Sequence, residues 1–301
     1  MYRWWVYQRE RFPIFAHGML IAAFSVSAMG FSSLLRKQTH LPPTATLAAG
    51  FASSLLFFLQ LRITDEFKDQ EDDARYRPYR PVPRGLVTLR ELAIVGLGAA
   101  AIQLTLALLV YPRLVIVLVG VWAYLGLMTR EFFVSRWLKR HPVVYMATHM
   151  LIMPFIDFYV TAFDWLVAGG GPPRGLAWFL SVSFFNGTVV EIGRKIRAPQ
   201  DEEHGVETYS FLWGTRGASL AWLAAIALTA ISSLFAATHI DFVRADAIVL
   251  AALVLVAVLL AARYMQAPTT ARAKAIEQMS GVWTLCMYLS LGALPFVVRL
   301  L

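Results

Sequence analysis

The sequence predicts an all-α integral membrane protein in which nine transmembrane helices form one bundle. Hydrophobic residues make up 58% of the 301 residues and charged residues only 15%, whereas an average soluble domain has about 25% charged residues. The apolar residues form long blocks instead of amphipathic stripes, and a spanning helix needs about 20 of them. When successive loops are assigned to alternate sides of a membrane, 21 of the 27 lysines and arginines fall on one side. We therefore expect residues 1–301 to form a single domain in the inner membrane, with that side facing the cytoplasm.

The elements follow the apolar blocks in chain order. Before the first block, Trp4 and Trp5 stand among arginines, as is typical of an interfacial segment at headgroup depth. The fourth block starts two residues after the third, so the turn at 111–113 must be tight. The expected spans are 13–35, 44–62, 91–111, 113–128, 143–163, 175–192, 217–237, 246–263 and 281–300.

Asp157 and His149 interrupt the apolar pattern of the fifth span. A charge at the bilayer centre costs at least about 2.5–3.5 kcal/mol, so Asp157 requires a reason. It could orient an acceptor, deprotonate an intermediate or lie nearer the outer interface than the expected span allows. His149, eight residues earlier on nearly the same helix face, is favoured as a hydrogen-bonded structural residue.

The loop after the second span carries six carboxylates within residues 65–73. Asp65, Asp69 and Asp73 recur every four residues, which places them on one helix face, and Glu66 stands beside Asp69. Like charges stacked in this way need a counter-ion. Oxygen ligands on one face suit Mg²⁺, which is usually held by one or two carboxylates and substrate phosphates. The alternative is a solvated loop balanced by neighbouring cations.

A basic, proline-rich stretch follows the acidic cluster. Arg77, Arg80 and Arg84 alternate with prolines, which favours a stiff extended segment. Guanidinium groups grip phosphate with two parallel hydrogen bonds. Carboxylates, a metal and arginines at a membrane surface together indicate a site for a diphosphate that carries a lipid tail.

The loop after the sixth span is the second acidic region, with five carboxylates in 191–207. Glu191 and Asp201 stand at its start and middle, with three basic residues between them. Glu191 either ligates the metal, orients a basic residue, or forms a surface salt bridge worth at most about 1 kcal/mol. Asn186, five residues before Glu191, points into the same end of the span.

The first region resembles the first signature of the UbiA superfamily of intramembrane prenyltransferases, Asn-Asp-x-x-Asp-x-x-x-Asp followed by an Arg-Pro-x-x-Arg-Pro-like element. Asp65 stands where the family has Asn, Glu66 where it has the first Asp, and Asp69 and Asp73 match directly. The second region matches a second family motif only from Asp201 onward, through Gly205 to Gly214.

The resemblance implies a UbiA-like bundle around a central cavity that opens sideways to the bilayer. It implies that an isoprenyl diphosphate is ionised with Mg²⁺ and that the allyl cation is transferred to a small or lipid acceptor. The implied metal ligands are Asp65, Glu66, Asp69, Asp73 and Asp201, and the implied catalytic set is Asp65, Asp69, Asp73, Glu191 and Asp201. The expected contacts to the diphosphate are Arg62, Arg80, Arg84, Lys139, Arg140, Asn186, Arg194, Lys195 and Arg197.

Other functions remain open at this point. A terpene cyclase on the same scaffold needs no acceptor, because a double bond of the substrate attacks the cation. The incomplete second motif keeps this alternative open. A transporter without chemistry would not predict paired acidic regions on one side. The net charge of +8 is explained by topology, so no nucleic-acid partner is expected.

Overall fold

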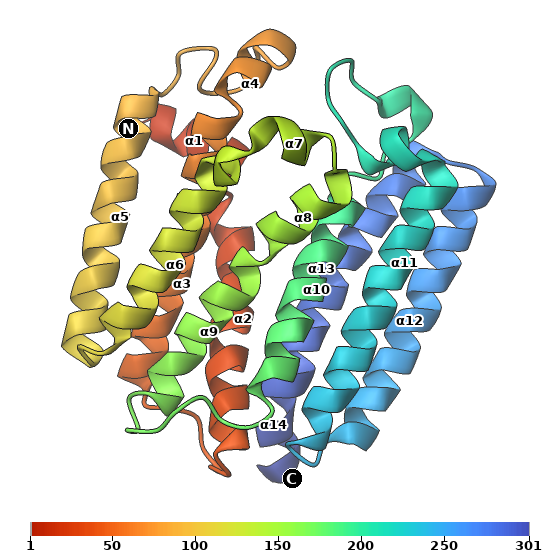
Figure 1. Ribbon diagram of the computed structural model, residues 1–301. Coiled ribbons are helices and arrows are strands. Elements are labelled where there is room, and N and C mark those ends of the chain that lie inside the picture. The colour runs from red at the N-terminus through yellow and green to blue at the C-terminus, as the bar shows by residue number, and fades with distance from the viewer. Residues whose placement is uncertain (1, 301) are drawn as a thin grey trace.

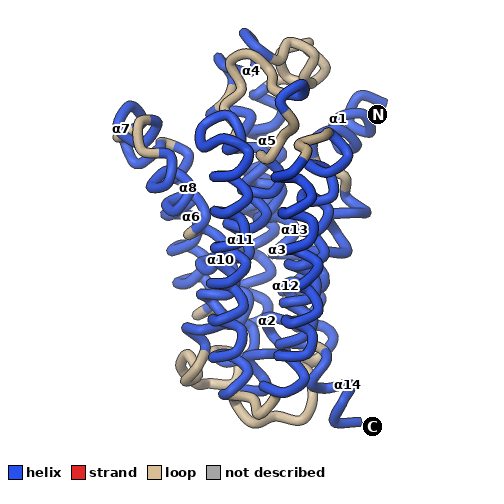
Figure 2. Tube along the Cα trace, turned by 90° about the vertical axis from the view of Figure 1, so that its right-hand side faces the viewer, coloured by secondary structure: helices blue, strands red, loops and turns tan. Residues whose placement is uncertain are grey.

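The computed structural model describes residues 2–300, which are helical or in loops, with no strand among them. The long helices run side by side (Figure 1). The short helices α1, α4 and α7 gather at one end of the bundle, which we call the motif end. The N-terminus lies at this end and the C-terminus at the opposite end (Figures 1 and 2). This placement agrees with an odd number of crossings.

The helices have the following bounds. They are α1 Tyr2–Arg11, α2 Ile14–Leu35, α3 Thr44–Lys68, α4 Gln70–Tyr76, α5 Leu89–Val110, α6 Leu114–Thr129, α7 Ser135–Lys139, α8 Pro142–Met150, α9 Ile152–Trp165, α10 Leu176–Arg194, α11 Tyr209–Thr238, α12 Val243–Gln266, α13 Thr270–Gly292 and α14 Leu294–Leu300, with 3₁₀ turns at Glu131–Phe133 and Pro199–Asp201.

Seven helical segments of the described chain are long and apolar enough to cross a membrane. They are α2, α3, α5, the α8–α9 pair, α10, α11 and α12; α6 is apolar but has only 16 residues. The expected total of nine spans therefore stays a prediction. The last span was misplaced at 281–300, because α13 begins at Thr270 and ends at Gly292. Charged residues in the first turns of α13 lower the hydropathy there, so the apolar block marks only part of the helix.

The fifth expected span is two helices. Helix α8 ends at Met150 and α9 begins at Ile152. Pro154 has no backbone N–H, so it cannot donate to the carbonyl of Met150 four residues earlier. This missing bond explains the break at Leu151.

The first and last long helices close the bundle. Helices α2 and α13 pack against each other, and α2 also packs against α3 and α9. The contact depends on small residues: a Cβ atom on Gly292 would lie 2.0 Å from the backbone oxygen of Ser27. Only glycine permits so close an approach of the two backbones.

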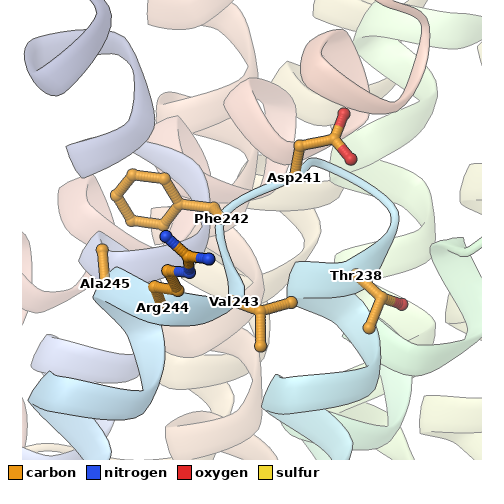
Figure 3. A pocket seen from close by; sticks show the side chains of 6 residues that line it. All are labelled: Thr238, Asp241, Phe242, Val243, Arg244 and Ala245. Atoms are coloured by element: carbon orange, nitrogen blue, oxygen red, sulfur yellow. The ribbon is translucent and has the colours of Figure 1, made fainter.

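Two hollows stand out on the described surface. One, of about 560 Å³, lies at the α11–α12 turn on the end opposite the motif end (Figure 3). None of the predicted site residues lines it. The other lies between α3, α5 and α6. The expected central cavity stays a prediction.

Candidate active site

The first acidic region continues α3 past its last apolar turn. Backbone bonds run from the Asp69 N–H to the Asp65 oxygen and from the Asp73 N–H to the Asp69 oxygen, at 2.9 and 2.8 Å. Asp69 itself interrupts the helix, with φ −93° and ψ 7°, between α3 and α4. The four-residue spacing is therefore preserved locally, with Asp65 on α3, Asp69 at the junction and Asp73 on α4.

The carboxylates of Asp65 and Asp69 accept no hydrogen bond from residues 2–300. Asp65 lies between Arg62 and Lys68, at 3.6 and 3.7 Å, which is too long for direct hydrogen bonds. Asp69 is half-buried. Burial raises the pKa of Asp69 above its ordinary value, the charges of Asp65 and Asp73 raise it further, and Lys68 opposes them. A cation at Asp69 would relieve this repulsion.

Glu66 and Asp73 have partners inside the protein. Glu66 is 2% exposed and pairs with Arg11 of α1. Asp73, equally buried, accepts two bonds from Arg80 Nη1, at 2.6 and 2.9 Å, and lies 2.9 Å from Arg77 Nε. The structure therefore does not place these two expected ligands with free carboxylates beside Asp69.

The arginines of this segment that were expected to contact the diphosphate differ in their hydrogen-bond partners. Arg80 is occupied by Asp73, and Arg84 donates to Glu10 and to the Tyr79 oxygen, each at 3.0 Å. Arg62 is instead a half-buried side chain whose Nε has no hydrogen-bond partner. Among the three arginines of this segment expected to contact the diphosphate, Arg62 is the one with a buried donor left over for a ligand; Arg77 Nε also lacks a hydrogen bond but lies 2.9 Å from Asp73.

The motif end of α10 supplies the second half of the site. The Glu191 carboxylate is 8% exposed and accepts from Arg194 Nε at 2.6 Å, while Lys195 Nζ lies 2.9 Å away. The side chains of Arg194 and Lys195 are 45% and 37% exposed, so the carboxylate is buried beneath two accessible cations. This is not an exposed surface salt bridge.

The two halves are close enough for their charges to interact. Asp65 is close enough to Arg194 for the two charges to attract, and Arg194 is close enough to Arg62 for the two positive charges to repel. The acidic end of α3 and the basic end of α10 both lie at the motif end of the bundle (Figure 1).

Asp201 lies on the second motif loop, and its expected role as a metal ligand stays a prediction. It lies in the Pro199–Asp201 turn, and its charge acts on Tyr264 of α12. Arg197 bonds to the Asp201 backbone oxygen at 3.3 Å and to Glu203 at 2.9 Å. Within residues 2–300 no group of three or more Asp, Glu, His or Cys side chains could hold a metal ion by itself.

Lys139 and Arg140 lie on the third loop of the motif end. Both are exposed, and Lys139 lies 3.8 Å from Asp72 of α4. This contact crosses the motif end from α7 to α4 and involves no buried group. It leaves the expected role of the two residues in binding diphosphate untested.

The two motif loops also touch. Tyr79 donates to Glu203 at 3.2 Å, and the rings of Tyr76 and His204 meet edge to face at 6.0 Å. The hydrogen bonds from Arg197 and then Tyr79 lower the pKa of Glu203. The loops after α3 and α10 therefore form one cover over the motif end.

A cluster of polar and aromatic side chains near Asp69 was not predicted from the sequence. Lys68 lies over the ring of Tyr145, at 5.6 Å, and Tyr145 donates to the buried Glu131 at 3.2 Å. His149 stacks on Tyr145, and its Nε2 is buried without a partner. The sequence offered only one signal for this cluster, a histidine on the fifth span.

Asp157 is fully buried within the bundle. Tyr288 of α13 donates to one of its oxygens at 3.0 Å and approaches Ser183 of α10 at 3.2 Å. The other Asp157 oxygen and both polar atoms of Asn186 are buried without partners. The three alternatives considered for Asp157 stay open.

The comparisons with known proteins agree with this arrangement. The family model of the UbiA prenyltransferase family matches residues 23–292. A digeranylgeranylglyceryl phosphate synthase of Korarchaeum cryptofilum (strain OPF8) is 25% identical over 193 residues, which cover 62% of this chain and 64% of that protein.

Two solved structures share the fold. The apo structure of a UbiA homologue from Aeropyrum pernix K1 has a TM-score of 0.68 at 16% identity, over 94% of this chain and 98% of that one. The structure of a digeranylgeranylglyceryl phosphate synthase has a TM-score of 0.64 at 15% identity, over 99% and 100%.

Proposed function

This chain belongs to the UbiA prenyltransferase family, and we propose that it is a Mg²⁺-dependent enzyme that transfers a prenyl group from an isoprenyl diphosphate to an acceptor in the membrane. One observation carries the proposal: the Asp65 carboxylate, which accepts no hydrogen bond within residues 2–300, is close enough to the exposed cation of Arg194 for their charges to interact. A diphosphate between these groups would meet a metal side and a basic side.

The residues fit a magnesium ion held jointly with substrate. Asp65 and Asp69 offer two hard oxygen ligands, and Mg²⁺ commonly binds one or two carboxylates together with substrate phosphates. The lack of a three-ligand cluster within residues 2–300 agrees with a metal that binds only with the diphosphate. When bound, the ion would neutralise charge on the departing oxygens.

The protein's own cations complete the site. Arg62 would donate its free Nε to the diphosphate. Arg194 and Lys195 would contact the opposite side, positioned by the buried Glu191 carboxylate. In the reaction, the C1–O bond of the prenyl group would break and its electron pair would leave with pyrophosphate. The acceptor's nucleophile would bond to C1, and the proton that it loses would pass to the departing pyrophosphate. The cations stabilise the charge that develops on pyrophosphate.

We further propose that the site faces the cytoplasm, as the 21-to-6 charge distribution predicts. The name of the Korarchaeum relative suggests an acceptor that is a lipid alcohol. A terpene cyclase remains a second candidate function, because the unpartnered, deeply buried oxygen of Asp157 could accept a proton from a hydrocarbon cation.

The experiment measures pyrophosphate release by the purified protein with geranyl, farnesyl and geranylgeranyl diphosphates, with and without Mg²⁺ and a lipid alcohol. Transfer predicts release that requires both the metal and the acceptor. Asp69→Asn should reduce turnover by at least about 100-fold, since one lost electrostatic contact in a transition state costs about 2.7–4 kcal/mol. Asp72→Asn is the matched control, because Asp72 is an exposed carboxylate of the same segment.

Hydrocarbon products without an acceptor would establish the cyclase instead. Equal turnover of the Asp69→Asn variant and the wild type would refute the metal assignment.

A further inference from the structure

Three aspartates are buried inside the long helices of the described chain, and two of them have partners that offset their charge. A buried carboxylate needs a cation, hydrogen-bond donors or a helix N-terminus, because it has lost its hydration. Asp164 accepts from Arg36 Nη1 at 2.7 Å, so its charge is paired. Asp246 lies in the first turn of α12, and its two oxygens accept from Ser233 and Ser290 at 2.8 and 2.7 Å.

Asp157, the third buried aspartate, differs from both. It is 0% exposed and lies in the second turn of α9, past the helix N-terminus. Its Oδ2 accepts from the Tyr288 hydroxyl at 3.0 Å, but its Oδ1 has no hydrogen-bond partner within residues 2–300. No charged side chain of the described residues pairs with it. An unpaired charge in the bilayer interior is strongly destabilising, so Asp157 must bind either a proton or another cation.

Neutral oxygens surround this carboxylate where α9 packs against α10 and α10 against α13. The Tyr288 hydroxyl lies 3.2 Å from Ser183 Oγ of α10. Asn186 follows Ser183 on the same face of α10, near the same tyrosine. Both polar atoms of Asn186 are buried without a partner in the part of the chain that the structure describes. We call Asp157, Ser183, Asn186 and Tyr288 the Asp157 cluster.

The chemistry of the Asp157 cluster decides which cation fits. Carboxylate, amide and hydroxyl oxygens are hard ligands, which suit hard cations. The cluster holds a single carboxylate, so one positive charge balances it, whereas a divalent ion would leave an uncompensated charge inside the membrane. Its four side chains are at most 2% exposed. A small ion therefore suits the space between these packed helices better than a large one.

We propose that the Asp157 cluster binds one Na⁺ ion in the core of the bundle. Asp157 Oδ1 and Asn186 Oδ1 are the principal ligands, because these two buried oxygens have no partner within residues 2–300. The hydroxyl oxygens of the cluster complete the set. The ion links α9 to α10 and α13 and so stabilises the folded state. This inference does not depend on the chemistry proposed for the active site.

The experiment compares unfolding of the purified protein in detergent in two salts at the same ionic strength. One salt is NaCl, and the other is the chloride of N-methyl-D-glucamine, a cation too large for the Asp157 cluster. An ion that binds only the folded state stabilises it, so NaCl should raise the unfolding midpoint by at least about 2 °C. Binding of radioactive ²²Na⁺ to the folded protein should show one ion per chain.

A matched pair of variants locates the ion. Asp157→Asn keeps the shape of the side chain but removes its charge, so it should lose both the midpoint shift and the bound ²²Na⁺. Asp246→Asn also removes a buried carboxylate, but one whose two oxygens already have donors. It should keep the midpoint shift and the bound ion, whatever its own stability.

Asn186→Leu tests the neutral ligand. It should weaken Na⁺ binding by at least about tenfold, since groups that merely support a ligand already contribute about 10- to 100-fold in metal affinity. This variant keeps Asp157, so it also decides the question if Asp157→Asn does not fold. Undiminished affinity in Asn186→Leu would overturn the proposed site.

Two results with the other proteins would also overturn the proposal. Equal midpoints of the wild type in the two salts, without bound ²²Na⁺, would mean that a proton neutralises Asp157. A sodium-dependent shift that persists in Asp157→Asn would mean that the ion binds elsewhere, for example among the carboxylates of the motif end.

Discussion

Arg11→Gln should destabilise the protein strongly, although Arg11 lies in a terminal helix. Its partner Glu66 has a side chain that is 1% exposed, and Arg11 itself is 11% exposed. Removing one member of a buried ion pair costs about 3–5 kcal/mol, because the remaining charge stays buried. Arg62 lies close enough to Glu66 to interact with it, so we expect a loss near the lower end, about 3 kcal/mol.

The double variant separates pairing from other effects. Arg11→Gln with Glu66→Gln leaves no buried charge and should recover at least about 2 kcal/mol of the loss as a coupling free energy. The assay is unfolding by sodium dodecyl sulfate in mixed micelles, followed by tryptophan fluorescence. Magnesium-dependent turnover of Glu66→Gln is measured in parallel and should persist.

Either of two results would refute this reasoning. A loss below about 1 kcal/mol for Arg11→Gln would mean that the pair behaves like an exposed one. A collapse of turnover in Glu66→Gln without a loss of stability would make Glu66 a metal ligand after all.

Three other changes test the site and the packing. Glu191→Gln should lower kcat/KM by about 10- to 100-fold, or about 1.4–2.7 kcal/mol. Its stability loss should be at most about 1 kcal/mol, because the cations that pair with Glu191 reach solvent. Turnover equal to that of the exposed control Glu207→Gln would exclude a role for Glu191 in the reaction. Arg80→Lys keeps the charge but loses the planar guanidinium that binds the buried Asp73 carboxylate. The unfolding midpoint should therefore fall. An unchanged midpoint would contradict a structural role for this pair. Gly292→Ala should lower the free energy of unfolding by about 1–3 kcal/mol, because it forces the backbones of α2 and α13 apart. The control Gly281→Ala has open space at its Cβ and should cost less than about 0.5 kcal/mol. Equal unfolding free energies of the two variants would show that the close approach of α2 and α13 is not needed.

Much of the fold was predictable because hydropathy is a local property. The bounds of α2 and α5 differ by one or two residues from the expected spans. The misplaced final span shows the limit of this signal: a helix can extend beyond its apolar block, as α13 does at Thr270. The break between α8 and α9 was also encoded locally, by Pro154.

The candidate site was predictable in its residue types but not in its pairings. The spacing of Asp65 and Asp69 indicated a metal, and the structure leaves both loosely held. The same spacing could not indicate that Glu66 pairs with Arg11, 55 residues away along the chain. Nor could it indicate that Arg80 is occupied by Asp73.

The sequence by itself determined that the chain is a helical membrane bundle with two acidic regions at one end, because apolar length, charge asymmetry and four-residue spacing belong to single segments. Only the tertiary structure decided which carboxylates are neutralised and which remain available. That outcome depends on contacts between helices that are far apart in the chain. Helix α1, for example, brings Arg11 within hydrogen-bonding distance of Glu66 on α3 and not of Asp69, which lies about one turn away.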